Sequence, residues 1–141
     1  MFRRSSVRHH REETLLAPST LSIVDVSNQA ISSQKMAQMK PADDEAIRQV
    51  MAANWYHSYE VLPGLITPGK HLTDAGKIFA DRYSLPDNLT GMTALDIGTL
   101  DGPYAFEMER RGARVTAMDI QDPDRTGFNT AKRVRGSHVH Y

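Results

Sequence analysis

The pattern of hydrophobic and polar positions changes period several times in the last third of the chain. Short apolar runs of strand length occupy 92–97 and 114–119, and helix-tolerant residues occupy 103–111 and 126–135. Val139 and Tyr141 predict the opening of a third strand, from 137 onward. This order of strand, helix, strand, helix and strand predicts an α/β fold with a parallel sheet and right-handed crossovers.

Residues that start and stop helices support these boundaries. Pro103 suits the first helical position, because its missing N–H would have no helical partner there in any case. Gly112 and Gly136 supply left-handed ends for the two helices, and Thr126 is expected to cap the second one. The expected buried side of that second helix consists of Phe128, Ala131 and Val134.

A helix is also expected at the beginning of the segment 41–91. Asp43 or Asp44 would cap it, and it would run through Asn54. Its apolar face is predicted to consist of Ala46, Ile47, Val50 and Met51. The simplest role for this helix is to pack against the main domain.

The remainder of that segment contains a stretch without periodicity and a second helix. Trp55–Gly69 is dense in aromatic residues, prolines and glycines, which indicates a structured loop. Thr73 or Asp74 would cap the second helix, which would continue through Tyr83. Its inward positions are predicted to be Ala75, Ile78 and Phe79.

Residues 1–40 show no sustained period and are expected to form a disordered leader. Arginines crowd its beginning, polar residues dominate the remainder of the leader, and 21–26 is a brief apolar patch. An alternative is that the arginines form a basic arm that binds RNA phosphates.

The stretch that bears most on function is the turn 98–102, Gly-Thr-Leu-Asp-Gly, between the first strand and the first helix. Such a turn presents backbone N–H groups and the positive end of a helix to an anionic ligand group. Asp119 ends the next apolar run, so its carboxylate is expected at the tip of the neighbouring parallel strand, where it could hold a ribose diol. We therefore predict a nucleoside-cofactor site.

The spacing of the glycines bears on which cofactor is bound. A dinucleotide fingerprint would need glycines where Leu100 and Pro103 stand, which disfavours a nicotinamide dinucleotide. Asp96, Gly98 and Gly102 instead resemble the motif of Rossmann-like, class I S-adenosylmethionine-dependent methyltransferases, in which an acidic residue precedes alternating glycines. Leu100 departs from that motif at its middle glycine.

A second motif makes the resemblance more specific. Residues 55–60, Trp-Tyr-His-Ser-Tyr-Glu, are followed by Leu-Pro-Gly at 62–64 and Thr-Pro-Gly at 67–69. These segments resemble the beginning of methyltransferases related to the tRNA wobble-uridine 5-oxyacetate methyltransferases. The similarity extends from about Asn54 to Tyr141.

The resemblance implies S-adenosyl-L-methionine as cofactor and either a tRNA uridine or a small metabolite as methyl acceptor. Asp96 would attract the ammonium group of the methionine moiety, the turn amides would face its carboxylate, and Asp119 would bind the adenosine hydroxyls. The cofactor-binding residues implied are Asp96, Gly98, Thr99, Leu100, Asp101, Gly102, Asp119 and Ile120. Three aromatic residues either roof the cofactor and acceptor or simply pack the first helix onto the sheet: Trp55, Tyr56 and His57.

The expected organisation is a leader at 1–40, a helical and loop segment at 41–91, and the first part of a doubly wound, Rossmann-like sheet at 92–141. A doubly wound sheet needs a further strand beyond its first, so we expect this chain to be the N-terminal part of a longer enzyme. The acceptor pocket and the catalytic residues would then lie beyond Tyr141. Two alternatives are a non-catalytic remnant or interaction fragment, and part of a nicotinamide-dependent oxidoreductase.

Composition narrows the partners. Seventeen basic residues balance seventeen acidic ones, so no whole-molecule field attracts nucleic acid or an acidic membrane. Cysteine is absent, and no apolar run reaches transmembrane length, so we expect a cytoplasmic protein.

His138 and His140 lack acidic or cysteine neighbours, so no metal site is predicted. The pairs Arg110-Arg111 and Lys132-Arg133 are expected to be solvated charges.

Overall fold

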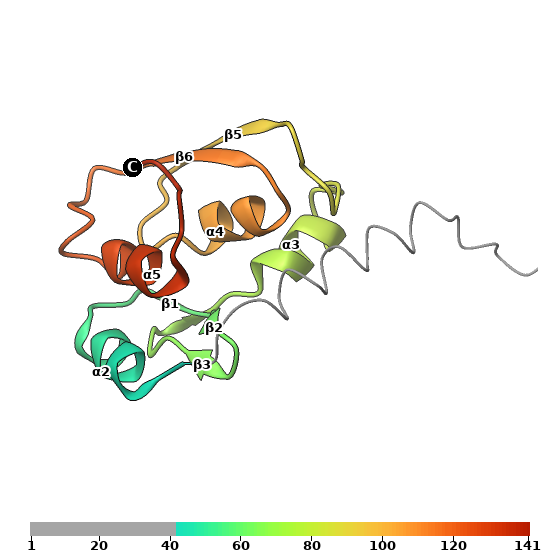
Figure 1. The fold of residues 1–141 in the computed structure, drawn as a ribbon. Coiled ribbons are helices and arrows are strands. Elements are labelled where there is room, and N and C mark those ends of the chain that lie inside the picture. The colour runs from blue at the N-terminus through green and yellow to red at the C-terminus, as the bar shows by residue number, and fades with distance from the viewer. Residues whose placement is uncertain (1–41) are drawn as a thin grey trace, which may run out of the picture.

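Four helices and three small sheets form the part of the chain that the structure, a computed structural model, describes, residues 42–141 (Figure 1). The expected leader at 1–40, with its apolar patch and its arginines, lies outside these residues. The helices are α2 (Asp44–Ala52), α3 (Ala75–Asp81), α4 (Pro103–Arg110) and α5 (Phe128–Arg135). The strands are β1 (His57–Ser58), β2 (Glu60–Leu62), β3 (Leu65–Ile66), β4 (His71–Leu72), β5 (Thr93–Ile97) and β6 (Arg114–Met118).

The β5–α4–β6 unit confirms the predicted parallel crossover. β5 and β6 pair in parallel from Thr93 opposite Arg114 to Ile97 opposite Met118. The expected third strand is reduced to one parallel bridge, which joins His140 to Thr116. The chain is therefore α/β, and its parallel sheet places the carboxyl ends of β5 and β6 side by side.

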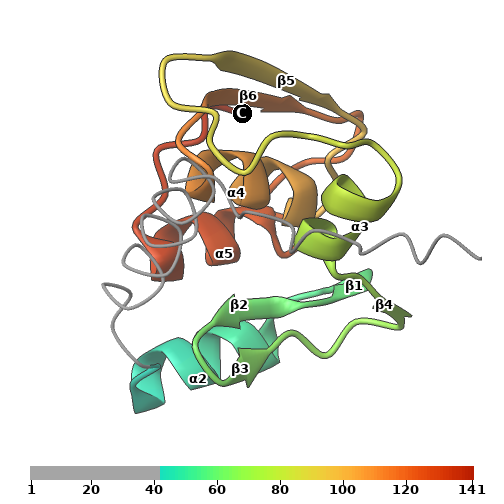
Figure 2. The same cartoon turned by 90° about the vertical axis from the view of Figure 1, so that its right-hand side faces the viewer.

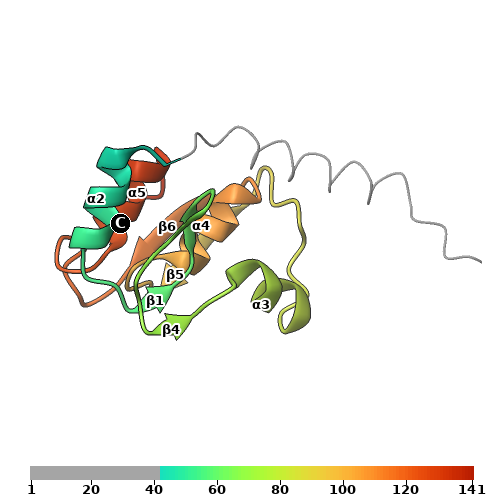
Figure 3. The ribbon, with the colours of Figure 1, turned by 90° about the horizontal axis from the view of Figure 1, so that it is seen from below.

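The elements lie in layers. Figure 2 shows the β5–β6 sheet on one side, α4 and α5 beneath it, and the small strands β1–β4 with α2 beyond the helices. Helix α2 lies beside α5 (Figure 3), where the Arg133 Nε donates to Gln49 Oε1 at 3.0 Å. The core runs between these layers and includes Val50, Trp55, Tyr59, Val61, Phe106, Val115, Ala117, Phe128 and Val139.

The two faces of the β5–β6 sheet differ in cover. Val115 and Ala117 of β6 face the helices and are buried. The other face carries Leu95, Ile97 and Met118, whose exposed fractions are 57%, 72% and 49%. Residues 42–141 thus leave an apolar surface on the side of the sheet away from α4 and α5.

Aspartate side chains begin the first two helices, as the sequence predicted. Asp43 Oδ1 accepts from the Ala46 amide at 2.9 Å, and Asp74 Oδ1 accepts from the Lys77 amide at 2.8 Å. The predicted apolar face of α2 is wrong in part, because Ile47 and Met51 are exposed. Helix α2 rests on α5 along the narrower stripe of Val50 and its partly buried neighbour Ala46.

The stretch predicted as a loop, Trp55–Gly69, contains three strands. β2 and β3 form an antiparallel hairpin that turns at Gly64, and β1 pairs in parallel with β4. Strands of two or three residues are too short to show a period of two, so their sequence does not distinguish them from a loop.

Arg111 contradicts the prediction that the arginine pair at the end of α4 is solvated. Its side chain is buried and donates from Nε to Glu107 Oε1 at 2.8 Å. Its guanidinium also donates to the carbonyl oxygens of Leu85, Pro86 and Gly76. Arg110 is paired with Glu107 as well, through two nitrogens at 2.6 and 2.7 Å. These residues fasten the connector that precedes β5 and the start of α3 to helix α4.

The start of α5 also differs from the prediction. Gly127, rather than Thr126, occupies the N-cap position, and the helix begins at Phe128. The Thr126 hydroxyl still accepts from the Phe128 amide at 3.4 Å, and it donates to the Leu100 carbonyl at 3.0 Å. Thr126 therefore connects the segment that precedes α5 to the glycine turn. Gly136 ends α5 in the left-handed conformation, as predicted.

Candidate functional site

The glycine turn follows β5 directly and is wound tightly. Three of its five residues have positive φ angles: Gly98 at 80°, Leu100 at 53° and Gly102 at 90°. A Cβ at Gly102 would lie 2.4 Å from the Phe106 ring, so the position also requires glycine for space. Leu100, which departs from the methyltransferase motif, nevertheless has the left-handed backbone that the motif's middle glycine would favour.

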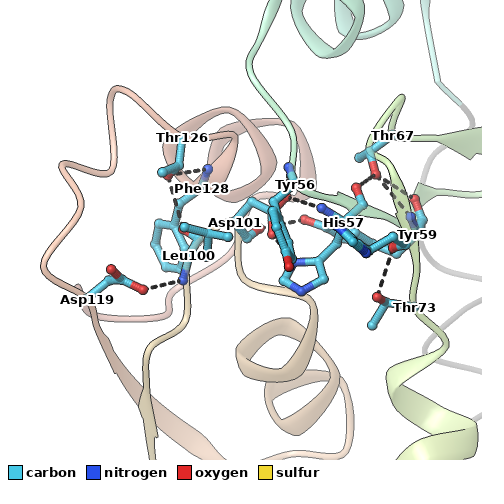
Figure 4. A network of polar contacts seen from close by, with 11 residues as sticks. Tyr56, His57, Tyr59, Thr67, Thr73, Leu100, Asp101, Asp119, Thr126 and Phe128 are labelled. Carbon is cyan, nitrogen blue, oxygen red and sulfur yellow. Dashed lines mark hydrogen bonds and ion pairs between the residues drawn. The ribbon is translucent and has the colours of Figure 1, made fainter.

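The backbone around Leu100 explains how a leucine is held in this conformation. The Leu100 amide donates to Asp119 Oδ2 at 2.9 Å, and the Leu100 carbonyl accepts from the Thr126 hydroxyl (Figure 4). A left-handed non-glycine residue costs on the order of 1–3 kcal/mol and persists only where its surroundings fix it. Both polar groups of the Leu100 peptide are fixed in this way.

Most turn amides already have partners within the protein, which corrects the expectation that the turn presents them to a ligand. The amides of Gly98 and Thr99 donate to the Met118 carbonyl, and the amide of Gly102 donates to the Thr99 carbonyl. The Leu100 amide is bound to Asp119. Among residues 42–141, only the Asp101 amide of this turn has no hydrogen-bond acceptor.

Asp119 stands at the carboxyl end of β6, as predicted. Its two carboxylate oxygens accept from the amides of Leu100 and Gln121, each at 2.9 Å. Each oxygen retains a further lone pair that could accept from a hydroxyl group. The neighbouring Ile120 side chain is 98% exposed, so it offers an apolar surface beside this carboxylate.

Two polar atoms at the beginning of the turn are buried without a hydrogen-bond partner. They are Asp96 Oδ2, at the end of β5, and the Thr99 hydroxyl oxygen. Burial raises the pKa of Asp96, while the nearby Thr99 hydroxyl and the Ala105 amide act in the opposite direction. Thr99 therefore lies near the carboxyl group, although no hydrogen bond of ordinary geometry joins the two. Buried polar atoms without a partner in the protein are rare, and strain, an ordered water or a bound group can explain them.

Asp101 has the opposite environment, because its carboxylate faces the protein interior. Its carboxylate is fully buried and accepts from the amides of Tyr56 and His57, each at 2.8 Å. The Nδ1 atom of His57 also contacts it, and the Tyr59 hydroxyl donates to the Asp101 carbonyl at 2.8 Å (Figure 4). Asp101 thus joins the glycine turn to the strands of the N-terminal segment.

The three aromatic residues proposed as a roof have different surroundings. Trp55 is buried, its indole N–H donates to the Val50 carbonyl at 2.6 Å, and its ring lies where a Cβ at Gly127 would be. It therefore seals α2 onto the start of α5. Tyr56 is half exposed and stacks on His71 with ring centroids 4.2 Å apart. Of the three, only His57 and Tyr56 lie beside the glycine turn.

The Thr-Pro-Gly motif holds the backbone of His57. The Thr67 hydroxyl donates to the His57 carbonyl at 2.7 Å, and it accepts from the Tyr59 amide at 3.0 Å (Figure 4). A Cβ at Gly69 would lie 2.1 Å from the His57 carbonyl oxygen, so only glycine fits there. Sequence reasoning missed this clamp and the Asp101–His57 pair, because both join positions that lie far apart in the chain or in different motifs.

A cavity of about 400 Å³ lies away from the glycine turn, between the β2–β3 hairpin, the start of α3 and helix α4. Its lining is mainly apolar and includes Val61, Leu62, Phe106 and Arg135. The Arg135 guanidinium donates to the Val61 carbonyl at 2.7 Å and lies over the Phe106 ring. None of Asp96, Gly98, Leu100 and Asp119 borders this space, so we place the candidate site on the chemistry of the turn and not on this cavity.

Within residues 42–141, no three histidine or acidic side chains are grouped so as to hold a metal ion. No helix in this range is long and apolar enough to cross a membrane.

Comparisons of the chain with protein-family models, with curated proteins and with solved structures found no match. Any function must therefore be argued from the site itself.

Proposed function

We propose that this chain carries the cofactor-binding half of an S-adenosylmethionine-dependent methyltransferase, with its site at the carboxyl ends of β5 and β6. The observation that carries the proposal is the buried Asp96 Oδ2 without a partner at the beginning of a glycine turn. In an open α/β sheet, ligands bind outside the carboxyl ends of the parallel strands. Asp96 and Asp119 stand at those ends on adjacent strands.

The residues at the turn fit the chemistry of this cofactor. Asp96 would accept from the ammonium group of the methionine moiety, which would compensate a carboxylate that burial otherwise destabilises. Asp119 would accept from the ribose hydroxyls through its remaining lone pairs, and Ile120 would lie against the adenine ring. The Thr99 hydroxyl would find a polar partner on the same ligand.

When bound, S-adenosylmethionine supplies an electrophilic methyl group. The residues described here would hold and orient it, and alignment with the acceptor is the main requirement for methyl transfer. The acceptor would be a modified tRNA uridine or a small metabolite, and the fold does not distinguish between the two.

Calorimetric titration of the chain with S-adenosylhomocysteine tests this proposal. Wild-type protein should bind it and should not bind NADH, and Asp119→Ala should abolish binding. Asp81→Ala, which removes an exposed carboxylate on α3, is the matched control and should bind normally. A chain that unfolds cooperatively but binds neither ligand would contradict the proposal.

The uncovered face of the β5–β6 sheet favours a second candidate, a non-catalytic interaction fragment. Leu95, Ile97 and Met118 form an apolar surface of the kind that marks contact sites between proteins. A broad, non-cooperative melting transition together with no cofactor binding would favour this candidate over the first.

A further inference from the structure

We propose that His57 recognises the α-carboxylate of the cofactor's methionine end, and that it forms with Asp96 a paired site for the whole zwitterionic amino acid. This inference rests on the proposed function. It assigns a specificity-determining role to a residue that lies outside the glycine turn, in the N-terminal segment. The turn amides were expected to face this carboxylate, but most of them are already hydrogen-bonded within the protein. In this proposal His57 takes their place.

His57 is fixed in position from several directions. Its Nδ1 contacts the buried Asp101 carboxylate, and its backbone is held by Asp101 and by the Thr67 hydroxyl. The rings of Tyr56 and Tyr104 contact the imidazole edge-on, with centroids 4.9 and 6.3 Å away. A side chain held in this way loses little conformational freedom when it binds a ligand.

The second ring nitrogen of His57 is available for such a ligand. Its Nε2 has no hydrogen-bond partner among residues 42–141, and the side chain is 14% exposed, so it is accessible but largely shielded from water. With Nδ1 donating to Asp101, a protonated ring has one remaining N–H, at Nε2. Charge-assisted hydrogen bonds to carboxylates in such surroundings are among the stronger ones in proteins.

Two side chains near the turn match the two charged groups of an amino acid. His57 contacts Asp101 within the glycine turn, and Asp96 lies near the end of the strand that leads into the same turn. The two side chains therefore bring an imidazole, which can carry a positive charge, and a carboxylate to the same turn. Asp101 is the third charge in this cluster, but it is fully buried and bound to His57 and two amides. A zwitterion that binds with its ammonium at Asp96 would bring its carboxylate towards His57.

A purely structural role for His57 is the competing explanation, since the ring also neutralises Asp101. Two ligands separate these roles: S-adenosylhomocysteine, and its decarboxylated analogue, which keeps the ammonium group but lacks the carboxylate. His57→Asn keeps a donor near the Nδ1 position and removes the one at Nε2. His57→Gln is the companion variant, because its longer amide restores a donor near Nε2.

We expect His57→Asn to weaken S-adenosylhomocysteine binding about ten- to hundred-fold, the usual effect of losing a charge-assisted hydrogen bond. Its affinity for the decarboxylated analogue should change by less than about two-fold, within ordinary variation for an uninvolved site. His57→Gln should recover part of the lost affinity. Equal weakening for both ligands, or no weakening for either, would overturn the inference.

A measurement on the wild-type chain covers the case in which His57→Asn does not fold. In nitrogen NMR spectra of the imidazole, S-adenosylhomocysteine should shift the His57 Nε2 resonance, and the decarboxylated analogue should leave it nearly unchanged. Equal shifts with both ligands would overturn the inference while leaving the proposed function intact. Absence of binding by folded wild-type protein would instead overturn the proposed function, and this inference with it.

Discussion

The two ends of the glycine turn present aspartates in opposite states. Just before the turn, Asp96 is partly buried, its Oδ2 atom is buried without a partner, and burial raises its pKa. At the end, Asp101 is fully buried, but its oxygens are engaged by two amides and an imidazole. The same residue type thus has two different environments within six residues of the chain. The carboxylate with partners joins the turn to the N-terminal segment, and the one with an oxygen that lacks a partner is the one that we propose binds a ligand.

The largest effect on stability should come from Asp101→Ala, which removes the carboxylate whose oxygens both have partners. It leaves the partly buried amides of Tyr56 and His57 without their acceptor, and it removes the partner of the His57 ring. We expect the free energy of unfolding to fall by about 3–5 kcal/mol, as is typical when one member of a buried pair is removed. Urea denaturation measures this loss.

Asp101→Asn is the control for this prediction. It keeps the shape of the side chain and one acceptor oxygen, so it should cost less than the alanine variant. A loss below about 1 kcal/mol for Asp101→Ala would contradict the structural role assigned to this carboxylate.

Gly69→Ala tests the clamp that holds His57 against Asp101. The new Cβ would lie 2.1 Å from the His57 carbonyl oxygen, so backbone atoms must shift. Overpacking of this kind costs about 1–3 kcal/mol of stability. Thermal melting of Gly69→Ala should show this loss, and Gly76→Ala, whose Cβ would meet only side-chain atoms and none nearer than 3.3 Å, should lose less. A wild-type melting temperature for Gly69→Ala would rule out the close contact.

Asp96→Asn should affect function without harming the fold. It replaces a buried carboxylate that has an orphaned oxygen, so unfolding free energy should stay within about 1 kcal/mol of wild type or rise. The same variant should weaken S-adenosylhomocysteine binding, because it removes the charge that we propose faces the ammonium group. Asp101→Asn provides the contrast, with a larger effect on unfolding. A strongly destabilised Asp96→Asn would show that the two aspartates do not differ as described.

The smallest effect concerns pH. The pKa of Asp96 is raised in the folded chain above its ordinary value of 3.8, so the folded state binds a proton more readily than the unfolded state. This group therefore costs no stability below pH 3.8 and costs progressively more as the pH rises from there through its folded pKa. Unfolding free energy should fall less steeply with pH over that range in Asp96→Asn than in wild type. Parallel pH profiles for the two proteins would contradict the raised pKa.

Glu107 should change stability with pH in the opposite direction. Burial favours its protonated form, but hydrogen bonds and charges from Arg110 and Arg111 outweigh that effect and lower the pKa of Glu107. Its stabilising contribution is therefore present above pH 4.5 and is lost as the pH falls through the lowered folded value. In Glu107→Gln this acid loss should be reduced, as measured by urea denaturation at a series of pH values.

The sequence predicted those parts of the fold that depend on local chemistry. The order of β5, α4, β6 and α5 follows from their apolar runs, and Asp43 and Asp74 cap helices because a short carboxylate can reach the nearby amides. The left-handed Gly136 at the end of α5 belongs to the same class. Each of these features depends on residues a few positions apart.

Contacts between distant segments were not predictable in this way. Arg111 is buried because carbonyl groups of the connector and α3 happen to meet it, and no pattern near Arg111 signals this. Asp101 binds His57 across 44 positions. The residue types of the candidate site could be predicted, but the distinction between Asp96 and Asp101 required the fold, since it depends on which groups lie opposite each carboxylate.

The most direct test of the cofactor site is a map of backbone amide shifts in the NMR spectrum of the chain as S-adenosylhomocysteine is added. We predict that the largest shifts fall on Gly98, Thr99 and Asp101 of the turn and on Asp119 and Ile120. Shifts confined to the cavity beside Arg135, or no shifts in a well-folded chain, would contradict a cofactor site at the carboxyl ends of β5 and β6.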